Sequence, residues 1–193
     1  MRRILMKLSF PRNLPLLAGL SVIFACSVFQ VQADDQPHSQ NRWSAREGIS
    51  IPLPDDLPRE ILRPIIEREA DRYNVPADLI ETVIEIESGF KPRARNGSAV
   101  GLMQIMLPTA RSMGFQGTQQ ELFDPETNIR YGAAYLAAAQ DAANGDLCGT
   151  VMRYQSGIEA MRMNRANRAY CAKAKTLIAL NNRSNNTPRH SVD

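Results

Sequence analysis

Apolar side chains recur every three or four residues through most of positions 58–180, which is the period of an α-helix. The recurrence after Pro64 continues up to Asn74, so we expect a helix that carries this proline in its first turn. A second helix is predicted from Pro76 to Ser88, because Gly89 and a later proline stop it.

The second half of the chain has the same period. It predicts helices at Pro108–Met113, Pro125–Ala143, Leu147–Tyr154 and Arg165–Leu180. No segment shows a sustained alternation of apolar and polar residues, so any sheet is small and is expected near residues 94–104. The pattern therefore predicts a mainly α, single-domain fold with at most a small β element.

The N-terminal segment has a different composition. Four basic residues precede an apolar run from Leu14 to Phe29, and small residues ending at Ala33 follow the run. This order is typical of a secretory signal peptide, so we expect residues 1–33 to be cleaved and the chain to be periplasmic. An uncleaved anchor is the alternative, although the run is short for a membrane span and contains Pro15.

Polar segments flank the periodic region on both sides. Residues 34–57 contain several prolines and are expected to form a flexible linker, and residues 181–193 are expected to form a flexible C-terminal tail. The two histidines, His38 and His190, lie in these flanks. A histidine triad or a histidine metal site within residues 58–180 is therefore excluded by composition.

The net charge depends on whether the signal peptide is counted. The whole chain carries 23 basic and 20 acidic residues, for a formal charge of +3. Cleavage after Ala33 removes four basic residues and no acidic one, which leaves a charge of −1. A nearly neutral chain without a long basic run is a poor candidate for binding nucleic acid.

The expected export also determines which of the three cysteines can pair. Cys26 lies inside the signal peptide, and Phe24 is too bulky for a good lipoprotein site. Cys148 and Cys171 remain as a pair in an oxidising compartment, so we expect a disulfide between them. Closing this loop of about 22 residues would contribute roughly 3 kcal/mol. Two free buried thiols are the alternative.

Glu87 is the candidate for chemistry that the helical pattern indicates. It follows Val83 by four positions and Ile80 by seven, so it ends an apolar stripe, whereas Glu81 and Glu85 are expected on a solvated face. Loss of water around Glu87 would raise its pKa, as the protonation of a glycosidic oxygen requires. The alternative is a helix-end glutamate that turns out to water.

Several short motifs follow one another in order through the predicted domain. They are Tyr73-Asn74-Val75-Pro76, Glu87-Ser88-Gly89-Phe90, Gly101-Leu102-Met103-Gln104, Pro108-Thr109-Ala110, Asp124-Pro125-Glu126-Thr127-Asn128-Ile129 and Gly132-Ala133-Ala134-Tyr135-Leu136. This ordered set resembles the lytic transglycosylases of the soluble (SLT), lysozyme-like superfamily over residues 58–180. The resemblance implies a lysozyme-like catalytic domain of the goose-type lysozyme and SLT kind.

The resemblance also implies roles for individual residues. Glu87 matches the sole catalytic glutamate of the family, and Ser88 matches a serine that orients the substrate. Met103 and Gln104 match the cleft segment, where Gln104 would bind sugar or support the glutamate. Simpler interpretations are a helix-end hydroxyl for Ser88, a core methionine for Met103 and a structural amide for Gln104.

The third family motif differs here. The usual Ala-Tyr-Asn-Ala-Gly is replaced by Arg153-Tyr154-Gln155-Ser156-Gly157. Tyr154 keeps the hydroxyl that is expected to reach Glu87, whereas Gln155 replaces the family asparagine and leaves the contacts of that amide in doubt. Tyr170 resembles the tyrosine of the last motif, and ordinary packing beside a disulfide is its alternative.

The resemblance implies cleavage of the β-1,4 bond between N-acetylmuramic acid and N-acetylglucosamine in peptidoglycan. Two-carboxylate glycosidases use water, but the family's single glutamate implies ring closure to a 1,6-anhydro sugar without water, metal or organic cofactor. The alternatives are a lysozyme-like muramidase or chitinase, and a catalytically silent peptidoglycan-binding module. Peptidoglycan glycan strands are the expected partner, with a cell-envelope or secretion-system assembly as a second.

Overall fold

A computed structural model of the chain describes residues 55–185, with side chains through Arg183. The signal peptide at 1–33, residues 34–54 and residues 186–193 lie outside the described residues. The elements in chain order are α1 (Arg59–Tyr73), α2 (Ala77–Glu87), β1 (Arg95–Asn96), β2 (Ala99–Val100), β3 (Ile105–Met106), α3 (Leu107–Ser112), the 3₁₀ turn η2 (Glu121–Phe123), α4 (Pro125–Ala142), α5 (Leu147–Ser156) and α6 (Arg165–Asn185). The predicted mainly α fold with a small sheet is confirmed.

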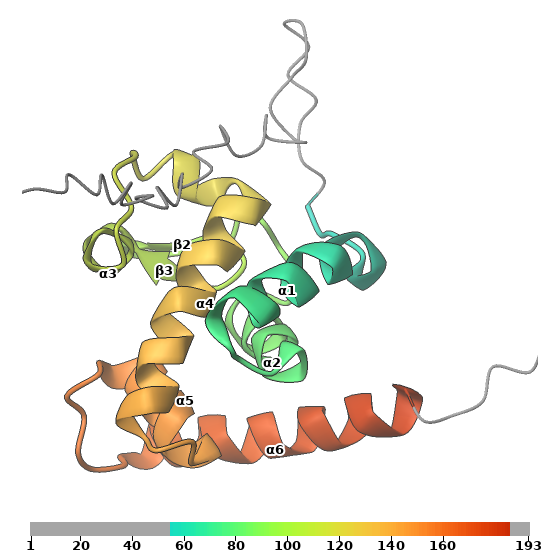
Figure 1. The fold of residues 1–193 in the computed structure, drawn as a ribbon, viewed down its shortest axis with the longest axis vertical. Helices are drawn as coiled ribbons and strands as arrows, with labels where there is room; N and C mark the ends of the chain where they lie inside the picture. The colour runs from blue at the N-terminus through green and yellow to red at the C-terminus, as the bar shows by residue number, and fades with distance from the viewer. Residues whose placement is uncertain (1–54, 186–193) are drawn as a thin grey trace, which may run out of the picture. The chain divides into compact units, whose positions relative to one another are not determined.

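Helix α4 lies at the centre of the described residues, with α1 and α2 on one side and α5 and α6 below them in the view (Figure 1). The core between these helices is built from the apolar stripes that the sequence shows. Ile80, Val83 and Ile84 of α2 and Ile129 and Leu136 of α4 are completely buried. Each such aliphatic side chain contributes about 1.5–3 kcal/mol through its burial.

Helix α1 begins earlier than predicted. Pro64 was expected in the first turn, but the helix starts at Arg59 and holds this proline in its interior. A proline there removes one backbone hydrogen bond and crowds the preceding turn. The turn before Pro64 is nevertheless held, because Leu62 is fully buried and Arg59 pairs with two glutamates of α2.

The three strands form one antiparallel sheet in the order β1-β2-β3. The first two lie within the predicted region 94–104, and β3 follows directly after it. A second, smaller core lies beside the sheet, where Val100, Ile105 and Leu122 are buried with Ala110 and Phe115.

The remaining helix ends agree with the predicted ends to within two residues, except that of α6. This helix continues to Asn185, five residues beyond the predicted end at Leu180. The sequence has no glycine or proline between Leu180 and Pro188, so nothing in it stops the helix earlier. Among residues 55–185, no helix is long and apolar enough to cross a membrane.

A disulfide joins α5 to α6, as expected from the cysteine pairing. It links Cys148 and Cys171, whose Cα atoms lie 5.2 Å apart. The bond fixes the start of α5 beside the residue that follows Tyr170. It therefore holds together two helices that both contribute to the site described next.

Candidate active site

A cleft of about 510 Å³ opens between α2, the sheet, α4 and α5. Its lining residues are Glu87, Asn96, Ala99, Gln104, Ile105, Met106, Thr109, Tyr135, Tyr154, Gln155, Ser156 and Gly157. Glu87 is the only acidic side chain among them. The positions of Asn96, Met106 and Tyr135 in the cleft lining were not predicted from the sequence.

Glu87 is the last residue of α2, where the apolar stripe of that helix ends. Burial raises its pKa above the ordinary value of 4.5, and this is the largest effect on the group. A hydrogen bond from Tyr170 and the positive charge of Lys173 both lower the pKa and so oppose the shift. The raised pKa expected from the helical spacing is thus confirmed.

The tyrosine that contacts Glu87 is Tyr170, not Tyr154. The Tyr170 hydroxyl donates to Oε1 of Glu87 at 3.0 Å. The Tyr154 hydroxyl was predicted to make this contact, but it donates to the backbone carbonyl of Met103 at 2.8 Å. A phenol has one proton to donate, and the buried Tyr154 ring points its hydroxyl at the loop before β3.

Burial keeps both tyrosines neutral. It raises the pKa of Tyr154 well above its ordinary value, and the negative charge of Glu87 raises it further. The pKa of Tyr170 is also raised, first by burial and then by Glu87. Both hydroxyls therefore act as hydrogen-bond donors at neutral pH, and neither competes with Glu87 as an acid.

Met103 was expected to line the cleft, but its side chain is fully buried, as the alternative of a core methionine requires. It packs against Gly132 of α4, where an added Cβ would collide with the methionine. The exposed methionine of this segment is Met106, which does line the cleft. The sequence could not distinguish the two methionines, since their burial depends on a helix that lies far along the chain.

Gln104 lines the cleft but uses its amide for structure. Its Nε2 donates to the carbonyl oxygens of Ala94 at 3.0 Å and Gly101 at 2.8 Å. The Ser88 hydroxyl likewise donates to the carbonyl of Ile84 at 3.1 Å and is not part of the cleft lining. These contacts match the simpler interpretations of both residues in this state of the protein.

The buried amide of Asn128, to which the sequence pattern gave no role, holds the cleft segment in place. Asn128 of α4 is completely buried and accepts the Met103 N–H at 2.7 Å. Its Nδ2 donates to the carbonyls of Val100 and Leu122 at 2.9 and 2.7 Å. Gly101 lies against this amide with a φ of +77°, and a Cβ there would collide with Asn128.

Gln155 and Ser156, at the end of α5, are exposed in the cleft wall. Both accept hydrogen bonds from Nδ2 of Asn167, with Gln155 Oε1 at 2.7 Å and Ser156 Oγ at 2.8 Å. Asn167 itself is fully buried at the start of α6. Gln155, which stands where the family has asparagine, is therefore hydrogen-bonded to α6.

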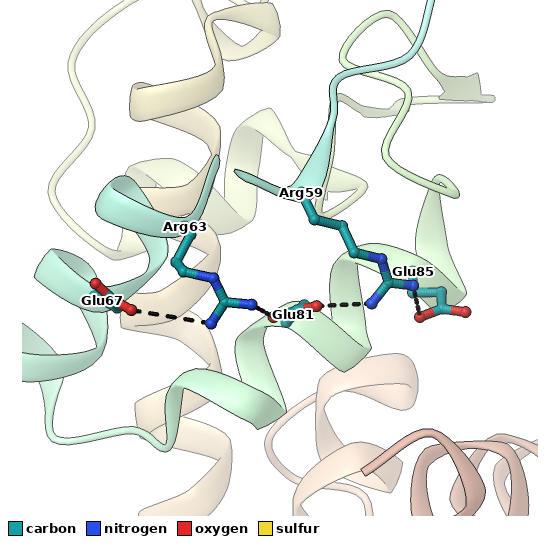
Figure 2. Close-up of polar contacts among 5 residues, drawn as sticks. All are labelled: Arg59, Arg63, Glu67, Glu81 and Glu85. Carbon is teal, nitrogen blue, oxygen red and sulfur yellow. Dashed lines mark hydrogen bonds and ion pairs between the residues drawn. The ribbon is translucent and has the colours of Figure 1, made fainter. Parts of the chain in front are cut away.

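The other glutamates of α2 face away from this chemistry. Glu81 was expected on a solvated face, but it is buried and pairs with Arg59 at 2.7 Å and Arg63 at 3.9 Å. Glu85 pairs with the same Arg59 at 2.6 Å. Figure 2 shows these side chains bridging α1 and α2. The sequence pattern missed this because the cationic partners lie on another helix.

Within residues 55–185, no three histidine, cysteine, aspartate or glutamate side chains come together in a way that could hold a metal ion. The described site offers one carboxyl group, the hydroxyls of Tyr135, Tyr154 and Tyr170, those of Thr109 and Ser156, and several amides.

This chain is similar in sequence to a known family and to several known proteins. A family model described as "Transglycosylase SLT domain" matches residues 64–177. Membrane-bound lytic murein transglycosylase C of Edwardsiella ictaluri is 40% identical over 104 residues, which are 50% of this chain and 29% of that protein. Endo-type membrane-bound lytic murein transglycosylase A of Salmonella paratyphi B is 42% identical over 103 residues, 47% of this chain and 49% of that protein.

A solved structure shares the fold. It is an inactive mutant of the lytic transglycosylase Slt from Pseudomonas aeruginosa, with a TM-score of 0.58 and 25% identity over 66% of this chain and 25% of that chain. This chain spans less than half the length of each of these relatives. Because the family match covers more than half of the sequence, the chain belongs to the Transglycosylase SLT domain family.

Proposed function

We propose that the protein is a peptidoglycan lytic transglycosylase in which Glu87 is both the general acid and the general base. The observation that carries the proposal is the single carboxyl group in the cleft, whose pKa is raised by burial. A carboxylic acid that stays protonated toward neutral pH can protonate a glycosidic oxygen. No second carboxylate lines the described cleft to activate a water or to form a glycosyl intermediate.

In the first step, the Glu87 proton moves to the oxygen that links N-acetylmuramic acid to N-acetylglucosamine. The bond between that oxygen and the anomeric carbon breaks, and the N-acetylglucosamine end leaves as an alcohol. The acetamido oxygen of the muramyl sugar stabilises the positive charge at the anomeric carbon. Tyr170 donates to the newly formed Glu87 carboxylate and stabilises it.

In the second step, the Glu87 carboxylate removes the proton from the 6-hydroxyl of the same muramyl sugar. The 6-oxygen then bonds to the anomeric carbon and closes a 1,6-anhydro ring. Glu87 ends the cycle protonated, as it began, and no water is consumed. The reaction is therefore an intramolecular substitution at the anomeric carbon, in which the 6-oxygen replaces the leaving oxygen, and it needs one carboxyl group.

Similar proteins support the proposal. The relatives from Edwardsiella ictaluri and Salmonella paratyphi B are named lytic murein transglycosylases. The Pseudomonas aeruginosa neighbour is a lytic transglycosylase mutant in which replacing a glutamate by glutamine gives an inactive protein. An essential glutamate in that protein fits the role that we assign to Glu87.

Digestion of purified murein sacculi tests the proposal. We expect soluble muropeptides about 18 Da lighter than the hydrolytic ones, because one water fewer is used, and resistant to borohydride. Reducible products would assign a lysozyme-like hydrolase to the same cleft. Binding of sacculi without any release would indicate a binding module. Either of these results would overturn the proposed reaction.

The proposal includes a periplasmic location. The signal-like residues 1–33, the Cys148–Cys171 disulfide and the membrane-bound names of the relatives support it. A cell-envelope or secretion-system assembly as a second partner stays a prediction. The segment that we expect to contact it is residues 34–57, almost all of which lie outside the described residues. Co-purification of the full chain with and without residues 34–54 would test it.

A further inference from the structure

The N-terminal cap of α6, next to the end of α5, also orients a side-chain amide beside the cleft. Asn164 precedes α6, and its Oδ1 accepts the backbone N–H of Asn167 at 2.9 Å. In return, Oδ1 of Asn167 accepts the backbone N–H of Asn164 at 3.0 Å. This reciprocal pair is a capping box, in which two otherwise unsatisfied backbone donors are paired.

The cap fixes which way the Asn167 amide faces. A backbone N–H can only donate, so the atom of Asn167 that it meets must be the oxygen. The NH₂ group of Asn167 is then turned toward α5, where it donates to Gln155 and Ser156. Since Asn167 is completely buried, this orientation is held by packing as well as by hydrogen bonds.

The orientation of the Asn167 amide in turn fixes the orientation of the Gln155 amide. The atom of Gln155 that faces the Asn167 NH₂ group must be an acceptor, which is Oε1 at 2.7 Å. The remaining part of the Gln155 amide is its own NH₂ group, on an exposed side chain that lines the cleft. The cleft wall therefore presents hydrogen-bond donors at this position.

We propose that Asn167 is a positioning residue, which holds the Gln155 NH₂ group toward the cleft so that it donates to the acetamido carbonyl oxygen of a bound N-acetyl sugar. The inference rests on the proposed function, because that substrate carries acetamido groups. An amide carbonyl only accepts, whereas a sugar hydroxyl can both accept and donate. A donor at this position can serve an acetamido carbonyl or a hydroxyl, whereas an acceptor can serve only the hydroxyl. Turning the Gln155 amide around should therefore weaken the binding of acetamido sugars and leave that of plain hexoses unchanged.

Asn167→Asp tests the inference with a nearly unchanged shape. One carboxylate oxygen keeps the backbone cap of Asn164, and the other now faces Gln155 as an acceptor. Gln155 must then turn its NH₂ group inward and its oxygen toward the cleft. Asn164→Asp is the matched control, because it introduces the same charge at the same cap and leaves the amide of Asn167 unchanged.

Calorimetric binding would be measured in the Glu87→Gln form of the whole chain, which cannot cleave its ligand in the proposed mechanism. The probes are the β-1,4 tetramer of N-acetylglucosamine and cellotetraose, which lacks acetamido groups. We expect Asn167→Asp and Gln155→Ala each to weaken binding of the N-acetyl tetramer roughly tenfold, the effect of one hydrogen bond, with little change for cellotetraose. The double variant should be no weaker than Gln155→Ala alone.

Several results would overturn the inference. These are tight binding of the N-acetyl tetramer by Asn167→Asp, an equal loss in Asn164→Asp, additive losses in the double variant, or no tetramer binding by the parent. If Asn167→Asp does not fold, Gln155→Glu replaces it, since it also presents an oxygen to the cleft. Failure of the proposed function would appear separately, as a wild-type chain that binds the tetramer but releases no anhydro product from sacculi.

Discussion

Three glutamates of α2 lie within seven positions of one another and have different surroundings. Glu81 and Glu85 each pair with Arg59, at 2.7 and 2.6 Å, and together they join α2 to α1 (Figure 2). Glu87 lies on the cleft side, where its hydrogen-bond partner is the neutral hydroxyl of Tyr170. A cationic partner favours the charged form of a carboxylate and so suits an ion pair that joins two helices. A neutral donor leaves the carboxyl group able to gain and lose a proton.

Glu87→Gln is the change with the largest expected effect. It removes the only acidic proton of the cleft, so the release of muropeptides should fall by about 10³-fold or more while the fold is kept. Near-normal release by the purified variant would contradict the assignment. Circular dichroism and sacculus binding provide the control for folding.

The same variant should change how stability depends on pH. Burial raises the pKa of Glu87, so the folded protein binds more protons than the unfolded chain between the ordinary value of 4.5 and the raised value. Wild-type stability should therefore fall as pH rises through that window, and this loss should be absent in Glu87→Gln. Denaturant titrations at several pH values would measure it, and identical curves for both proteins would contradict it.

Tyr170→Phe is expected to have the next largest effect. It removes the donor to the Glu87 carboxylate, so kcat/KM should fall roughly tenfold or more. Because this hydrogen bond lowers the pKa of Glu87, its loss should move the alkaline limb of the pH–rate profile to higher pH. Tyr154→Phe is the control, since its hydroxyl bonds to Met103 and its loss should leave that limb in place.

Glu81→Gln tests the structural side of the comparison. Glu81 is buried beside Arg59 and Arg63, and its loss should lower the free energy of unfolding by about 1–2 kcal/mol, between the values for exposed and buried pairs. Activity per folded molecule should not change. Glu67→Gln is the matched control, because Glu67 is exposed and lies 4.0 Å from Arg63, and it should change stability by less than about 0.5 kcal/mol.

Lys173→Met should have the smallest effect. The charge of this exposed lysine lowers the pKa of Glu87, so its removal should move the alkaline limb slightly upward. Salt should reduce the difference between variant and wild type, because exposed charges are screened. Lys175→Met, two positions along α6, should leave the limb where it is. A downward movement in Lys173→Met would contradict the account.

Several features of the molecule could be predicted from local or compositional signals in the sequence. The helical period of α2 placed Glu87 at the end of an apolar stripe, since residues four and seven positions apart share a face, but its catalytic role was implied by the resemblance to the family. The Cys148–Cys171 pair follows from export and from the number of cysteines. The ends of α2 and α4 follow from glycine and proline positions, which act on the backbone directly.

Contacts between distant segments could not be predicted from the same sequence. Met103, in the turn before β3, is buried because Gly132 of α4 leaves room for it. Tyr154 and Tyr170 are chemically alike, and their roles differ only because the packing of α5 and α6 points one hydroxyl at a carbonyl and the other at Glu87. Asn167 has no local signal of its own, since its role depends on the end of α5.

Digestion of murein sacculi in ¹⁸O-enriched water tests the central claim most directly. If Glu87 alone closes the 1,6-anhydro ring, the released muropeptides should carry no ¹⁸O at the muramyl anomeric carbon. Incorporation of ¹⁸O at that carbon would show that water attacks it, and would contradict a single-carboxylate transglycosylase.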